Sequence, residues 1–218
     1  MGILLLLLII GLFFPFLWLP ILVFAGLFLI FIPLKFTVDS LFNIFTVPTQ
    51  IYKIATNPLL KKNHALEHAA VNILEQNSAY NNLAGYATED GFYIMGAESP
   101  LEVERAARQG LKLMKQGQKE LAVHKNCGTS LIVANFVSAI IFLGILFYLG
   151  YFSILGMLAA IILAHLFGPY LGQMVQKNFT TTPEVKEMEI DNASFESTGN
   201  WRSARKIFVK TSRVPYIR

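Results

Sequence analysis

Formal charge is missing from two long stretches of this chain. Residues 1–34 contain no Asp, Glu, Lys or Arg, and residues 129–173 contain none either. Segments that lie in the hydrocarbon of a bilayer avoid formal charge, whereas soluble domains seldom run so far without it. A hydrophobic content of 54% and a mean hydropathy of +0.51 agree with this pattern. The chain is therefore predicted to be an integral membrane protein, with the lipid bilayer as its first partner.

Basic clusters and cysteine pairs are also scarce. The formal net charge is +4, but no run of Lys and Arg is interleaved with aromatic residues, so we expect no nucleic-acid partner. The single cysteine, Cys127, excludes a disulfide within the chain. A lone cysteine is compatible with a reducing compartment that faces the cytoplasm.

Residues 1–34 are predicted to be an N-terminal membrane anchor. The stretch lacks the basic start and the cleavage site of a signal peptide, so we expect it to stay uncleaved. A straight helix over residues 3–34 would be roughly 48 Å long, which exceeds a hydrocarbon core of about 30 Å. Gly11, Pro15 and Pro20 are candidate break points. Two arrangements remain open, a single kinked span or a re-entrant hairpin.

The next two segments are predicted to be an interfacial helix and a small domain. Residues 35–56 form the interfacial region, with a helix over 36–45 that ends before Pro48; the alternative is a helix packed on the domain. Residues 57–128 read as an α-β-β-α domain. We expect a helix from about residue 64 to 76 with Asn63 as its N-cap, strands over 83–88 and 91–95, and a helix from Ser99-Pro100 to about residue 117.

Residues 129–173 are predicted to form a transmembrane helical hairpin, and residues 174–218 a cytoplasmic tail. In the tail we expect a strand over 206–210 and a loop over 191–202. Two spans return the chain to its starting side, and basic residues flank the spans, so the domain and the tail should share the cytoplasmic face of a plasma or thylakoid membrane. The predicted fold is an α-helical integral membrane protein with a small α+β (α-β-β-α) cytoplasmic insert.

The pattern HxxEH at His64, Glu67 and His68 is the strongest local sign of chemistry. On a helix, two imidazoles four residues apart lie one turn apart and can hold a single ion, with the carboxylate beside them. In zinc hydrolases with this arrangement the glutamate acts as the general base. The alternative is that these three side chains form the solvated face of an amphipathic helix.

A second cluster, His124 and Cys127, spaces an imidazole and a thiol by three residues, a common interval for two metal ligands. Together the two motifs predict a zinc site with His64, His68, His124 and Cys127 as ligands. The alternative for Cys127 is a small buried side chain that packs at the membrane surface. The histidine of the predicted hairpin, His165, is expected to be a hydrogen-bonded packing residue outside the site.

Four segments resemble a cyanobacterial membrane-protein family of unknown function. They are NHALEHAA at 63–70, GFYIMG at 91–96, HKNCGTS at 124–130 and LGQMVQKNFTTTPEV at 171–185. More distantly, HALEH and HKNCGTS resemble the HGAEH and HPRCGTS motifs of a bacterial membrane family described as predicted metal-dependent enzymes. Carried over residue by residue, that resemblance implies a metal site at His64, Glu67, His68, His124 and Cys127.

Two functions follow from these motifs. The first is a membrane-anchored zinc protein that acts as a metal-dependent hydrolase, with Glu67 as the catalytic base. The second is a non-enzymatic scaffold or assembly factor that binds another membrane protein and whose metal, where present, is structural. Coordination separates them, because three protein ligands leave a position for water and four close the site.

Overall fold

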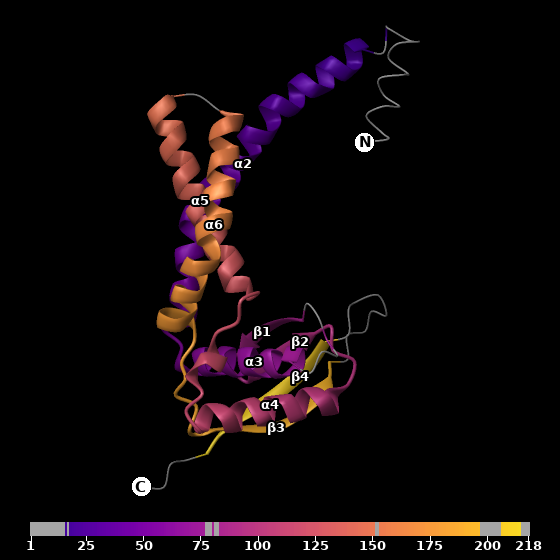
Figure 1. Ribbon diagram of the computed structural model, residues 1–218, viewed down its shortest axis with the longest axis vertical. Helices are drawn as coiled ribbons and strands as arrows, with labels where there is room; N and C mark the ends of the chain where they lie inside the picture. The colour runs from indigo at the N-terminus through magenta and orange to yellow at the C-terminus, as the bar shows by residue number, and fades with distance from the viewer. Residues whose placement is uncertain are drawn as a thin grey trace.

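The computed structural model describes residues 16, 18–76, 80, 83–150, 153–196 and 206–214. Three long helices stand as a bundle, and a small α/β unit lies at one end of it (Figure 1). Three helical segments are long and apolar enough to cross a membrane, Trp18–Ala55, Gly128–Leu149 and Ile154–Thr180. The helices are α2 (Trp18–Ala55), α3 (Pro58–Gln76), α4 (Pro100–Lys115), the 3-10 helix η2 (Lys119–Ala122), α5 (Gly128–Leu149), α6 (Ile154–Val175) and the π-helix η3 (Gln176–Thr180).

Helix α2 is one continuous helix, so the prediction that a helix ends before Pro48 is wrong. Pro33 and Pro48 both lie inside it. Thr46 and Thr49, on either side of Pro48, donate their hydroxyls to carbonyls one turn back, at 2.9 and 2.8 Å. These hydroxyls support carbonyls near that of Ile44, which loses its usual N–H donor to Pro48. Gly11 and Pro15 lie outside the described residues, and so does the first half of the predicted re-entrant hairpin.

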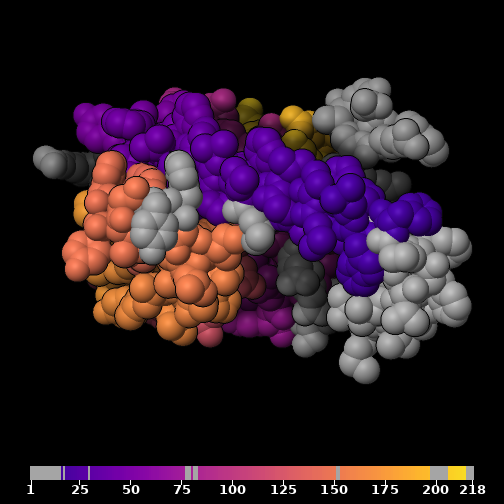
Figure 2. All heavy atoms as spheres, turned by 90° about the horizontal axis from the view of Figure 1, so that it is seen from above, coloured from indigo at the N-terminus to yellow at the C-terminus, as the bar shows by residue number. Residues whose placement is uncertain are grey.

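Figure 1 shows that α2 bends and that its N-terminal part leans away from α5 and α6. Seen along the bundle in Figure 2, this part extends beyond the pair formed by α5 and α6. Internal prolines are the usual cause of such a bend. The rest of α2 runs beside α5, where the ring of Phe36 meets the ring of Phe142 edge-on, with centroids 4.9 Å apart.

Helices α5 and α6 form the predicted hairpin and pack closely. Gly150 ends α5 in the left-handed conformation, with φ 73°. A Cβ atom at Gly168 would lie 2.4 Å from the Cβ of Ala134, and one at Gly172 would lie 2.5 Å from the Cα of Ser130. Small residues at these positions therefore let the two backbones approach.

A four-stranded antiparallel sheet joins the predicted domain to the predicted tail. Strands β1 (Ala84–Thr88) and β2 (Gly91–Met95) form the hairpin expected from the sequence, and β3 (Met188–Phe195) and β4 (Lys206–Arg213) come from the tail, in the order β1-β2-β4-β3. The loop predicted over 191–202 is wrong for 191–195, which belong to β3; residues 197–202 lie outside the described part. Strand β3 lies at the edge of the sheet, and its polar side chains obscure the strand pattern in the sequence. It also carries a bulge between Ile190 and Asn192.

The core of the α/β unit lies between the sheet and helices α3 and α4. Phe92 pairs with Val209, and Ile94 pairs with Ile207. All four side chains are fully buried in one cluster with residues of both helices. Because β4 belongs to the tail, the tail completes the core of the unit.

Candidate metal centre

Helix α3 carries the HxxEH motif, and it begins earlier than predicted. Asn57 caps it, because its side-chain oxygen accepts hydrogen bonds from the backbone N–H groups of Leu59 and Leu60, both at 3.1 Å. Pro58 occupies the first turn, where a missing N–H costs nothing. The prediction of Asn63 as N-cap is therefore wrong. Asn63 is fully buried inside the helix and binds the carbonyls of Thr88 and Glu89 instead.

The motif lies in the interior of the protein. His64, Glu67 and His68 are 6%, 5% and 1% exposed. The alternative that they form a solvated helix face is therefore wrong. Since the apolar side chains from Ala65 to Leu74 are buried as well, this part of the helix is covered on every side, and its buried polar groups must find partners within the protein.

Both histidines of the motif have one ring nitrogen fixed by a backbone carbonyl. His64 donates from Nδ1 to the carbonyl oxygen of Thr180 at 2.9 Å, and His68 donates from Nδ1 to that of Ala122 at 2.8 Å. A carbonyl only accepts, so the proton sits on Nδ1 in both rings and Nε2 is unprotonated. Metal-binding histidines are commonly oriented in this way.

Cys127 completes a cluster with the two rings. Its Sγ lies 3.4 Å from Nε2 of His64, and the ligand atoms of His64, His68 and Cys127 all lie within 4.8 Å of one another. Cys127 is also the N-cap of α5, where Sγ accepts a hydrogen bond from the N–H of Thr129 at 3.3 Å. The N-cap residue of the long apolar helix α5 is therefore one of the three members of the cluster.

The donor set and one buried nitrogen fit a metal ion. Nε2 of His68 is buried and has no hydrogen-bond partner within the part of the chain that the structure describes. An unsatisfied polar atom in the interior costs free energy, and a cation would satisfy it. Two ligand atoms of one tetrahedral zinc ion lie about 3.3 to 3.8 Å apart, given bond lengths of about 2.0 to 2.3 Å. The contact between His64 and Cys127 falls in this range.

His124 lies beside the cluster, but its ring binds elsewhere. Its ring centroid is 6.1 Å from that of His68, so the two motifs are brought together. Its Nε2 lies 3.0 Å from Oε2 of Glu75, and the group of candidate ligands found in the described residues contains His64, His68 and Cys127. Three of the four predicted ligands therefore converge, while His124 contacts a carboxylate.

Burial controls the protonation of the cluster. It lowers the pKa of His64 and lowers that of His68 well below its ordinary value, so both rings are neutral, as metal binding requires. Burial also raises the pKa of the Cys127 thiol. At Glu67, whose Oε2 is 3.9 Å from Nε2 of His64, burial raises the pKa to about 8.

Two residues that support the site were not identified from the sequence. A Cβ atom at Gly85 of β1 would lie 2.5 Å from Oε1 of Glu67, so only glycine leaves room for the buried carboxyl group there. Gln176 is fully buried. Its side chain accepts from the N–H of His124 and donates to the carbonyl of the same residue, at 3.0 and 3.1 Å. Gln176 lies in the segment 171–185 that resembles the cyanobacterial family, but its residue type alone indicates no role, and no short motif marks Gly85.

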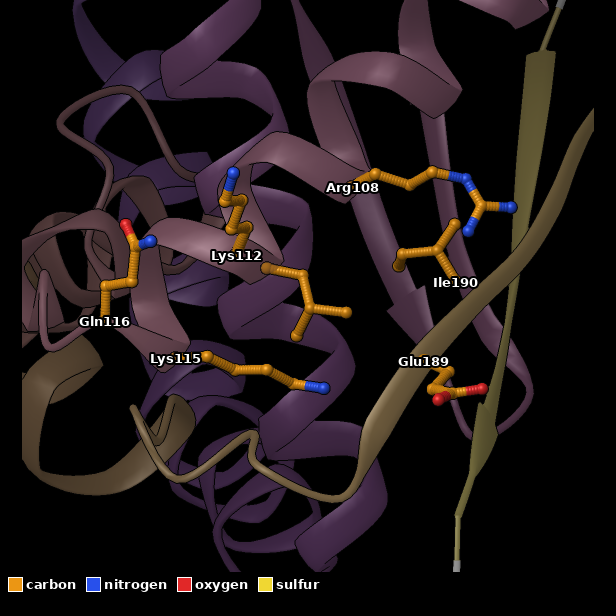
Figure 3. A pocket seen from close by; sticks show the side chains of 7 residues that line it. Arg108, Lys112, Lys115, Gln116, Glu189 and Ile190 are labelled. Atoms are coloured by element: carbon orange, nitrogen blue, oxygen red, sulfur yellow. The ribbon is translucent and has the colours of Figure 1, made fainter.

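A groove of about 470 Å³ lies apart from this cluster, between α4 and β3. Figure 3 shows Arg108, Lys112 and Lys115 around it, with Glu189 on the opposite side. Arg108 is already bonded to Glu104 and to the carbonyl of Asp191. The residues that line the groove include none of the cluster.

Fold and site define a class of protein, a bundle of apolar helices joined to a small α/β unit with a buried His/Cys cluster at the junction. The chain belongs to the family whose model is described as domain of unknown function (DUF6391), which matches residues 59–193. It is similar to an uncharacterised protein of the cyanobacterium Picosynechococcus sp. (strain PCC 7002), with 28% identity over 154 residues, covering 65% of this chain and 75% of the relative. No solved structure matches it significantly.

Proposed function

We propose that this protein is a membrane-anchored zinc protein, with His64, His68 and Cys127 as the ligands. The observation that carries the proposal is the buried Nε2 of His68, which has no hydrogen-bond partner among the described residues. The Nδ1 bonds of both histidines further support it, because they leave both Nε2 atoms unprotonated, and these two atoms and Sγ of Cys127 lie within 4.8 Å of one another. Two imidazoles and a thiolate suit zinc better than calcium or magnesium, which prefer oxygen ligands.

Hydrolysis is the reaction that we propose for the site. Three protein ligands leave one coordination position open, and zinc in such a site supplies Lewis-acid chemistry that activates water. Glu67 is the only carboxyl group of the motif and lies 3.9 Å from a ligand nitrogen. We assign it the role of proton acceptor. In the absence of a cation its pKa of about 8 keeps it protonated at neutral pH, and a nearby positive charge favours the carboxylate that can take a proton.

The membrane arrangement belongs to the same proposal. Helices α2, α5 and α6 cross the bilayer, and the α/β unit lies on the cytoplasmic side of a plasma or thylakoid membrane. The shared sheet supports placing the predicted domain and tail on one side, since β2 pairs with β4. Lys125 and Lys177 flank the hairpin at that end, as cytoplasmic loops do.

Paired variants test both the ligands and the proton acceptor. His68→Ala should abolish stoichiometric zinc, measured by elemental analysis of purified protein, whereas His165→Ala on the distant helix α6 should keep it. Glu67→Gln should keep zinc and thermal stability but fail to complement a strain that lacks the gene. Glu120→Gln, at an exposed position of η2, is the matched control and should complement.

A structural role for the metal is the second candidate, and one observation favours it. The cluster joins α3, the start of α5 and the carbonyl of Thr180 at the end of η3, so an ion there would fasten three separate segments. In that case Glu67→Gln should complement fully. Loss of zinc from Glu67→Gln would instead make Glu67 a ligand or an orienting partner. Wild-type protein without zinc would overturn both versions.

A further inference from the structure

The sheet of the α/β unit ends in two edge strands, β1 and β3, and helix α4 protects the edge of β3. The N–H of Ala193 donates to Oε2 of Glu104 at 3.1 Å. Arg108 donates to the carbonyl of Asp191 at 2.8 Å. A bulge interrupts the same strand. Covering side chains, charged residues and bulges are the usual means that keep an edge strand from pairing with another chain.

Strand β1 shows none of this protection within the described residues. Its sequence, AGYAT, has no charged residue and no proline. None of its five residues is buried, whereas three of the five residues of β2 are. Figure 1 shows β1 on the side of the unit that faces the helical bundle, and β3 on the opposite side. The open edge is therefore the one that lies towards the junction with the bundle.

The hydrogen-bond pattern shows which backbone groups of β1 lie on this edge. The N–H of Thr211 in β4 donates to the carbonyl of Asp90 at 3.0 Å, so the backbone of the next residue, Gly91, faces β1. Since pairing alternates along an antiparallel ladder, the N–H and C=O groups of Gly85 and Ala87 point away from β2. Within the part of the chain that the structure describes, these four groups make no hydrogen bond.

One of the two outward positions lies against the candidate site. Gly85 approaches Glu67 so closely that a Cβ atom added to the glycine would be 2.5 Å from Oε1. Oε2 of the same carboxyl group is 3.9 Å from Nε2 of His64. A strand that pairs with β1 lies about 4.8 Å from it. The backbone opposite Gly85 would therefore lie beside the carboxyl group to which we assign the role of proton acceptor.

We propose that the open edge of β1 binds the substrate, and that the substrate is a polypeptide in extended conformation. This inference rests on the proposed hydrolytic function of the same site. An added strand supplies N–H and C=O groups in the alternation that the edge requires, which the acyl chains of a lipid do not offer. A permanent strand at this position, such as that of a second copy, would cover Glu67 and close the site. The occupant is therefore a segment that is cleaved and released.

The reaction is the hydrolysis of a peptide bond and consumes one water molecule. The water oxygen forms a bond with the carbonyl carbon, and the bond from this carbon to the amide nitrogen breaks, with its electron pair going to the nitrogen. Glu67 accepts one proton of the water and passes it to the leaving nitrogen, which also receives the second proton. The products are a carboxylate and an ammonium group.

Hydroxamates that differ only in their backbone test the proposal by binding rather than by turnover. Acetohydroxamate chelates zinc alone, whereas N-acetyl-tri-alanine hydroxamate adds a short strand with small side chains. In zinc-loaded wild-type protein, calorimetry should give about tenfold tighter binding for the peptide, since two added backbone hydrogen bonds contribute about that factor. The same peptide with N-methylated alanines has no donors for the ladder and should lose the gain.

Two proline variants, one on each edge of the sheet, form a matched pair. Ala87→Pro removes the outward N–H of β1 and should abolish the gain from the peptide, while acetohydroxamate binds as it does to wild type. Ala193→Pro removes the N–H of β3 that is bonded to Glu104 and should keep the gain. Zinc content and Tm are measured for both variants to detect a folding defect, and the N-methylated peptide gives the same comparison in the unmodified protein.

The results distinguish a failure of this inference from a failure of the function on which it rests. Equal affinity of zinc-loaded wild type for the peptide, its N-methylated form and acetohydroxamate would overturn the role of β1 alone. Protein without zinc, or without affinity for acetohydroxamate, would overturn the hydrolytic function and this inference with it. A dimer in native mass spectrometry that Ala87→Pro dissociates would make a second copy the occupant of β1 and would also overturn the inference.

Discussion

Sγ of Cys127 lies 3.4 Å from Nε2 of His64, although 63 residues separate them in the chain. The two atoms come from different parts of the fold, since His64 is inside the buried helix α3 and Cys127 caps the apolar helix α5. Their proximity couples the α/β unit to the helical bundle. A change at this contact should therefore affect both ion binding and the attachment of the unit to the bundle.

Zinc binding is expected to release protons in a countable way. At pH 7 the Cys127 thiol and the Glu67 carboxyl group, with its pKa of about 8, are both protonated, while the two histidines are neutral. A bound cation favours thiolate and carboxylate, so about two protons should leave. Calorimetry in buffers of different ionisation enthalpy measures the number. Glu67→Gln should release about one proton fewer; an unchanged number would place Glu67 outside the field of the ion.

The contribution of Glu67 to the stability of the zinc-free protein is expected to fall as the pH rises. Glu67 has a folded pKa of about 8 against an ordinary value of 4.5, so the folded state holds this proton more tightly than the unfolded state. Between these values Glu67 binds fewer protons in the unfolded chain, and its contribution to the free energy of unfolding decreases with pH, by about 5 kcal/mol in all. The two histidines, whose pKa values are lowered, act in the opposite direction in every variant that keeps them. In chelator, the Tm of wild type and of Glu120→Gln should therefore fall relative to that of Glu67→Gln between pH 5 and pH 8. The same pH dependence in all three would contradict the assignment.

Gly85→Ala is expected to disturb Glu67 without touching a ligand. The added Cβ would lie 2.5 Å from Oε1 of Glu67 and 2.7 Å from the backbone oxygen of Tyr93, so the carboxyl group must move. Zinc content should stay near that of wild type, while activity in complementation falls. Gly117→Ala is a less suitable comparison because Gly117 has a positive φ. Gly144→Ala, with open space around the new methyl group, is the matched control.

Gln176 is expected to hold the second motif in position. Gln176→Ala removes both bonds to the backbone of His124 and one to the hydroxyl of Ser130. Buried groups left without partners cost about 1–3 kcal/mol each, so Tm should fall by several degrees, and zinc should bind more weakly. Gln109→Ala, at an exposed position of α4, should leave both unchanged. Normal zinc affinity in Gln176→Ala would show that the loop needs no such support.

The sequence predicts the local elements and the candidate ligands better than the way in which they come together. The hairpin at Asp90-Gly91 and the helix capped by Ser99 are where local residue chemistry predicts them. The sequence does not reveal strand β3, because an edge strand tolerates polar residues such as Asp191. The contact of His124 with Glu75 could not be foreseen, because it depends on how the segment before α5 crosses α3. The same holds for Gly85 and Gln176, whose roles exist only in three dimensions.

X-ray absorption at the zinc edge of purified wild-type protein tests most directly whether His64, His68 and Cys127 hold a zinc ion. We expect about one zinc per chain, coordinated by one sulfur, two imidazole nitrogens and one further light atom. Cys127→Ser should remove the sulfur from the spectrum. Stoichiometric zinc without sulfur, or protein that carries no zinc after purification in zinc-supplemented medium, would contradict it.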